Sequence, residues 1–111
     1  MDLVEDIQKL REKLNTSIIK LRDYGKELAE AERDYKVALR QEALKLKADG
    51  MAVTLINQIV YGVPEIAKKR CDRDIAQTMY TVAQENINSI KLQMRILEGQ
   101  VNREWGSNVE K

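Results

Sequence analysis

The stretch at residues 50–64, GMAVTLINQIVYGVP, decides how this chain is organised. It contains no charged side chain, although charged residues make up 33% of the sequence. It also holds the only proline, together with Gly50 and Gly62, which can end helices. Because charge-rich segments with helical periodicity lie on both sides, we predict that the chain reverses its direction in this elbow.

The segment before the elbow, residues 2–49, has the pattern of one long helix. Asp2 and Glu5 stand at capping-box spacing, which predicts a helix start, and Gly50 suits the left-handed position after its end. Heptad spacing predicts inward-facing positions at Ile7, Leu10, Leu14, Ser17, Leu21, Tyr24, Leu28, Ala31, Tyr35 and Ala38. Beyond Tyr35 the apolar stripe shifts to Leu39, Ala43 and Leu46.

Within the elbow we expect a short helical turn that Thr54 caps and Gly62 ends. Pro64 then fits the first position of a second long helix over residues 65–105, and residues 106–111 are expected to fray after Gly106. Heptad positions of this arm are Ala76, Tyr80, Ala83, Ile87, Ile90, Met94, Leu97 and Val101. Further apolar residues widen the stripe: Ile75, Met79, Val82, Leu92 and Ile96.

These segments predict an all-α fold, a single domain over residues 1–111 built as a long antiparallel helical hairpin with a short helical elbow. The excess apolar surface predicts assembly into a homo-oligomeric bundle, a dimer or higher. If Asp49 lies opposite Glu65, Gly25 faces Ser89 and Gly99 faces Asn15. Each interior glycine then either permits close approach of the helix backbones or lies on the surface.

The composition excludes most chemistry. The sequence has no histidine and one cysteine, so the commonest general base and the usual zinc ligands are missing. Glu27 and Glu30 form an ExxE pair of the kind that holds magnesium in all-α nucleotide pyrophosphatases, but no ExxD follows it, and with Asp23 and Asp34 they read as a solvated stripe. We therefore expect no enzymatic activity, no cofactor and no metal.

The lone cysteine, Cys71, indicates a reducing, cytoplasmic setting. Its basic neighbours allow a reactive thiol, while heptad extrapolation favours a small buried residue beside the core stripe. No apolar run is long enough to span a membrane, so no membrane association is expected.

The elbow is also a candidate protein-contact surface, because its apolar residues lie in a run that contains no charged side chain. Helical spacing directs Leu55, Ile59 and Ile56 inward, which leaves Val53, Val60 and Tyr61 as the candidate contact residues. The alternative is that all of these residues cap the end of the core.

A second candidate surface is basic. Lys36 and Arg40 lie four residues apart on the first arm, and Lys69 and Arg73 do so on the second. These four residues are candidate nucleic-acid contacts, although nearby acids and a net charge of +1 weaken the electrostatic attraction.

The segments ALRQEALKLKADGMAVTLINQIVYG, residues 38–62, and IKLQMRILE, residues 90–98, resemble small α-helical proteins encoded by phages and prophages of Gram-positive bacteria. That family has no settled activity, and the resemblance implies an intracellular accessory protein. The function expected from the sequence is a non-enzymatic, oligomeric protein-interaction module with a protein partner. The alternative is a nucleic-acid-binding accessory protein that uses the basic residues flanking the elbow.

Overall fold

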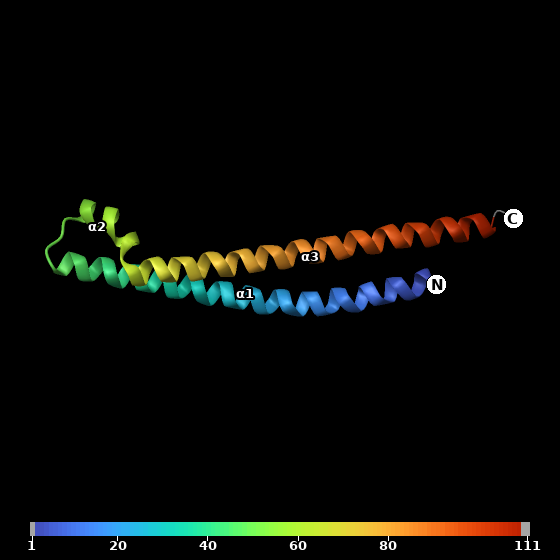
Figure 1. The fold of residues 1–111 in the computed structure, drawn as a ribbon, viewed down its shortest axis with the longest axis horizontal. Coiled ribbons are helices and arrows are strands. Elements are labelled where there is room, and N and C mark those ends of the chain that lie inside the picture. The colour runs from blue at the N-terminus through green and yellow to red at the C-terminus, as the bar shows by residue number, and fades with distance from the viewer. Residues whose placement is uncertain (1, 110–111) are drawn as a thin grey trace. The chain divides into compact units, whose positions relative to one another are not determined.

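The computed structural model describes the backbone of residues 2–109 and the side chains of residues 2–106. Its elements are α1 (Leu3–Ala48), α2 (Val53–Ile59), the 3-10 helix η1 (Val60–Gly62) and α3 (Pro64–Val109). The described residues form no strand. The predicted all-α helical hairpin with a short elbow helix is confirmed (Figure 1).

The chain divides into two compact units. The first combines α1 up to Asp23 with α3 from Thr81 onward, and the second spans residues 24–80 and includes the elbow. Within each unit the segments of α1 and α3 run antiparallel (Figure 1).

The two ends of α1 are closed by the residues that the sequence singles out. At the start, the Asp2 carboxylate accepts a hydrogen bond of 3.0 Å from the Val4 amide. At the end, Gly50 has a φ of 93°, a left-handed conformation that glycine adopts without steric cost. The amide of Gly50 donates to the carbonyl of Lys47 and that of Met51 to Leu46. This is a Schellman motif, and it stops α1 at Ala48.

Two predicted helix boundaries are wrong. Thr54 does not cap the elbow helix, because α2 begins at Val53 and its N-cap residue, Ala52, makes no side-chain capping bond. Gly106 does not end the second arm, since α3 continues to Val109 and only Gly50 among the described glycines has a positive φ. The expected fraying of residues 110 and 111 lies outside the described residues. Pro64 does begin α3, as predicted.

The core of the first unit follows the predicted heptads. Ile87 and Ile90 of α3 are 6% and 1% exposed, and Ser17 of α1 is buried with them. The Asn86 amide donates a 3.3 Å hydrogen bond to the Ser17 hydroxyl, so the one polar heptad position of α1 has a partner on the facing helix. Pairing of this kind removes the cost of burying a hydroxyl.

The second unit has its core at the elbow. Ile56 of α2, Val60 of η1 and Ile66 of α3 are almost fully buried. Figure 1 shows α2 beside the last turns of α1, where Leu39, Ala43 and Leu46 form the half-buried stripe. The predicted shift of the stripe after Tyr35 therefore marks the part of α1 that the elbow covers.

The predicted pairing of Gly25 with Ser89 is wrong. A Cβ atom on Gly25 would lie 3.3 Å from the Tyr80 ring, so Gly25 faces Tyr80, nine positions before Ser89. Gly25 thus leaves room for the Tyr80 ring of α3. A Cβ on Gly99 would meet only the Arg103 side chain of its own helix, at 3.9 Å, so no close helix contact requires that glycine.

The register of α3 against α1 differs from the predicted one because the elbow contains two short helices, α2 and η1, and not a tight turn. Glu65 lines a depression together with Val37 and Ala38, so α3 begins level with this part of α1 and not level with Asp49. Residues 39–48 extend beyond the start of α3, and α2 and η1 occupy that length instead.

We predict that Ile90→Asp lowers the free energy of unfolding by at least about 3 kcal/mol, because it places an unpaired charge at a fully buried position. Ile19→Asp is the matched control, since Ile19 is 55% exposed, and its effect should stay within about 1 kcal/mol. Urea unfolding followed by circular dichroism measures both. Equal losses would show that α3 presents a different face to the core.

Candidate functional site

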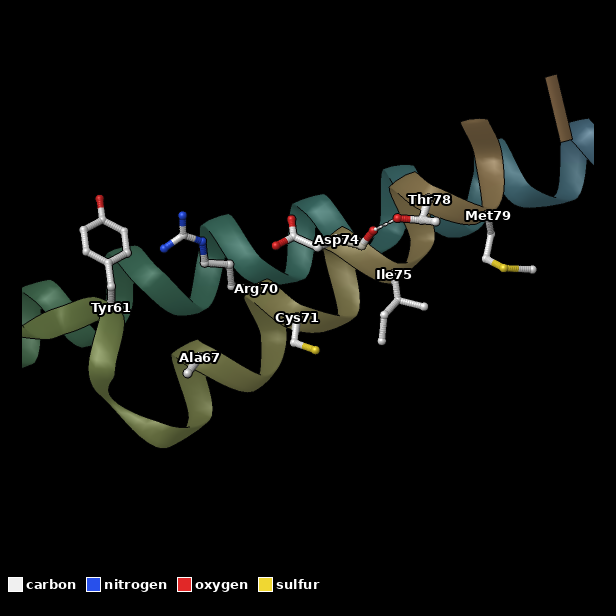
Figure 2. A pocket seen from close by; sticks show the side chains of 8 residues that line it. All are labelled: Tyr61, Ala67, Arg70, Cys71, Asp74, Ile75, Thr78 and Met79. Carbon is white, nitrogen blue, oxygen red and sulfur yellow. Dashed lines mark hydrogen bonds between the residues drawn. The ribbon is translucent and has the colours of Figure 1, made fainter. Parts of the chain in front are cut away.

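An open groove of about 520 Å³ runs along α3 in the second unit (Figure 2). Half of its lining residues are Ala67, Cys71, Ile75 and Met79. These residues recur every four positions and therefore form one ridge along the helix surface. Ile75 and Met79 remain 57% and 42% exposed. The groove is thus a mostly apolar strip with no described segment covering it.

Residues from the elbow and from the sides of α3 border this strip. Tyr61 of η1 is 46% exposed and lines the groove near the beginning of α3. The Arg70 guanidinium lies 5.6 Å from the centre of the Tyr61 ring, as their neighbouring positions in Figure 2 illustrate. The Thr78 hydroxyl donates to the backbone carbonyl of Asp74 at 3.0 Å, so its donor is satisfied within the helix.

The groove is free because α3 uses its opposite face to pack within the unit. Ile66 is 2% exposed and Tyr80 is half-buried against Gly25. Arg73 also points inward, with its guanidinium 4.8 Å from the centre of the buried Tyr35 ring. Helical spacing puts Cys71 and Ile75 on the far side from these three residues.

The expected exposure of the elbow residues is only partly correct. Val53 is 56% exposed and Tyr61 is accessible, as predicted, but Val60 is 3% exposed, so its expected exposure is wrong. Ile56 and Val60 are four residues apart and point together into the core. Val53 and Tyr61 remain predicted protein contacts, and Tyr61 also belongs to the groove.

The inward direction predicted for Leu55 and Ile59 is also wrong. Both side chains are accessible, 44% and 38% exposed, while Ile56 is the α2 residue that is buried. The buried side of α2 therefore includes Ile56 but neither Leu55 nor Ile59. Together with Val53, these residues give α2 an apolar outer surface.

The four basic candidates do not form one free cationic surface. Arg73 is partly buried on Tyr35 and pairs with Asp74 at 2.9 Å. Lys36 lies 3.3 Å from Glu32, and Arg40 is exposed. Nucleic-acid binding through these residues stays a prediction, although two of the four cations already have partners within the chain.

Lys69 lies among acids. It lines a depression of about 260 Å³ with Glu27, Glu30, Asp34 and Asp72, which includes most of the predicted acidic stripe. Among the described residues, no three carboxylate or thiol groups are arranged to hold a metal ion. Lys69 instead faces the negative charge of α1, which disfavours an additional phosphate contact at this position.

Cys71 is exposed, and the expectation that it lies beside the core stripe is wrong. The heptad pattern does predict an outward position for Cys71. Seven residues before Ala76 and Tyr80 are Lys69 and Arg73. Those two positions face inward, and residue 71 between them must face outward. The sequence singled out Ile75 and Met79 as excess apolar surface, but it did not place Cys71 with them, because Lys69 and Arg73 are charged and do not indicate the inward-facing side of this segment.

Comparison of the chain with protein-family models, curated proteins and solved structures found no significant match. None of the helices in the described part of the chain combines the length and apolar character needed to cross a membrane.

We predict that Val60→Ser lowers the free energy of unfolding by about 2 kcal/mol, because it removes buried apolar surface and buries a hydroxyl. Val53→Ser, the matched control on the exposed side of the elbow, should change it by less than about 0.5 kcal/mol. Thermal and urea unfolding of both variants measure the difference. Comparable losses would mean that Val53 also belongs to the core.

Proposed function

We propose that this chain is a non-enzymatic helical protein-interaction module that works as a homo-oligomer. The observation that carries the proposal is the apolar groove on α3, where Ile75, Met79 and Tyr61 stay accessible around Cys71. Apolar surface grouped in this way is typical of a protein-contact site, whereas single exposed apolar residues are ordinary.

The energetic gain from covering the groove supports association. Ile75 keeps 57% and Met79 keeps 42% of its surface in contact with water. Full burial of such a side chain stabilises by about 1.5–3 kcal/mol, so removing the remaining exposure of each gives on the order of 1 kcal/mol per residue. Several such residues on each of two surfaces supply a useful driving force.

The modest core gives a second reason for association. Few apolar side chains within the described part of the chain are buried: Tyr35, Ile56, Val60, Ile66, Ile87 and Ile90. Small domains bury a limited share of their surface and often depend on oligomerisation for stability. A partner on α3 would supplement this core.

The absence of histidine from the sequence supports a role without catalysis. A cytoplasmic, phage-derived accessory role is part of the same proposal. It is supported by the single cysteine and by the resemblance of residues 38–62 and 90–98 to phage-encoded helical proteins.

The proposal predicts an oligomer in solution. Light scattering after gel filtration at micromolar protein should give a multiple of the 12.8 kDa chain mass. Ile75→Ser should shift the mass toward the monomer, and Ile19→Ser, which removes an equally exposed isoleucine from α1, should leave it unchanged.

A wild-type mass near that of one chain would overturn self-association. Equal effects of Ile75→Ser and Ile19→Ser would remove the groove on α3 as the contact surface. Helicity measured on the same samples shows whether the monomeric chain keeps its fold.

A further inference from the structure

We infer that the occupant of the groove is the same face of a second copy, with the two α3 helices antiparallel about a twofold axis that passes close to Cys71. This inference rests on the proposed self-association and specifies its geometry. It is carried by the arrangement of charge and of residue size on the two sides of Cys71.

The charged residues on the two sides of the apolar ridge change sign at Cys71, and two of them, Arg70 and Asp74, line the groove. Lys68 and Arg70 precede Cys71, and Asp72 and Asp74 follow it. Lys68 and Asp72 are four residues apart and share one edge of the apolar ridge, while Arg70 and Asp74 share the other edge. Each edge therefore has a base before Cys71 and an acid after it.

These side chains are accessible to a partner. Lys68, Arg70 and Asp72 are exposed. The Asp74 side chain keeps 62% of its surface accessible although its Oδ1 accepts hydrogen bonds from Arg73. The inward-facing Arg73 lies over Tyr35, and its ion pair with Asp74 offsets part of the negative charge that Asp74 offers to a partner.

A twofold axis perpendicular to α3 at Cys71 brings two pairs of opposite charge together on each edge, against one pair of like charge beside the axis, Asp72 with Asp72 or Arg70 with Arg70. The axis reverses the chain direction but keeps each edge on its own side. Lys68 of one copy then lies beside Asp72 of the other, and Arg70 lies beside Asp74. With a rise of about 1.5 Å per residue, each such pair is offset by roughly 3 Å along the helix axis. A parallel pair in register would instead place the bases of both copies at one level and their acids at another.

Residue size agrees with the same axis. Ala67 and Ile75 each lie four residues from Cys71, so the axis brings Ile75 of one copy level with Ala67 of the other. A large side chain then meets a small one, which lets the two ridges interdigitate. Met79 and Tyr61 both line the groove. The axis places Met79 of one copy toward the end of the groove that Tyr61 of the other copy borders.

The two kinds of contact have different roles. Exposed ion pairs are worth about 0–1 kcal/mol each and weaken in salt, so the driving force comes from Ile75, Met79 and Tyr61. The charges select the antiparallel orientation and the centre of the contact. Adding salt should therefore weaken the dimer only modestly.

Thiol cross-linking tests the position of the axis. The two Cys71 thiols would lie next to each other, and helices in close contact bring facing Cα atoms within the 4.4–6.8 Å that a disulfide needs. Diamide, which accepts two electrons and two protons from two thiols, should rapidly convert the native protein to a disulfide-linked dimer. The Cys71→Ala/Ala29→Cys variant carries an exposed thiol on α1 instead and should cross-link at least about tenfold more slowly.

Light scattering on the same proteins before oxidation tests self-association separately from the position of the axis at Cys71. An oligomer whose Cys71 thiols cross-link no faster than the relocated thiol overturns the axis at Cys71 and leaves the interaction module standing. A monomer at all accessible concentrations overturns both. An oligomer with fast, Cys71-specific cross-linking supports both.

Charge exchange tests the pairing. Asp72→Lys replaces two symmetric attractions by repulsions and should weaken the dimer by roughly tenfold at low salt. Lys68→Glu/Asp72→Lys restores opposite signs and should recover the dissociation constant within about threefold. Glu12→Lys, which makes the same charge change on α1, should have no effect. Failure of the double exchange to recover the dimer would overturn the antiparallel pairing about Cys71.

Discussion

The left-handed turn at Gly50 is the constraint on which the rest of the molecule depends. Its φ of 93° ends α1 after Ala48, and the hydrogen bonds to Leu46 and Lys47 satisfy the last carbonyl groups of the helix. Without that stop, the apolar stripe of α1 would continue into the elbow. With it, α2 and η1 turn back, and α3 starts at Pro64 close to Val37 and Ala38 of α1.

In this arrangement one face of α3 packs within the elbow unit and the opposite face carries the groove. The inward face of the elbow unit combines Ile66 and Tyr80 with Arg73, whose guanidinium lies over the Tyr35 ring and pairs with Asp74. A cation over an aromatic ring is stabilised without complete loss of its hydration. Arg73 therefore occupies an inward position, while Cys71, Ile75 and Met79 lie on the outer face and line the groove.

The predictable parts of the structure were those governed by local periodicity. The heptads correctly placed Ile87, Ile90 and Tyr35 in the core, and glycine chemistry correctly ended α1 at Gly50. The register was not predictable, because it depends on how much of α1 the elbow covers, and Gly25 alone does not reveal that it faces Tyr80. Of the elbow contact residues, Val60 was misassigned because seven residues of helix do not distinguish one face from the next when nearly all are apolar.

Residues 39–48 of α1 extend beyond the start of α3, so the length of the elbow determines the register between the two helices. Since α2 and η1 fill this length, the number of residues between Asp49 and Val63 sets which turn of α1 meets which turn of α3. Adding or removing residues there would slide one helix along the other in the elbow unit and change the residue that Gly25 faces. Divergent versions of such a hairpin would therefore vary in length at the free ends of the helices, or by equal insertions in both helices. The elbow would keep a constant length.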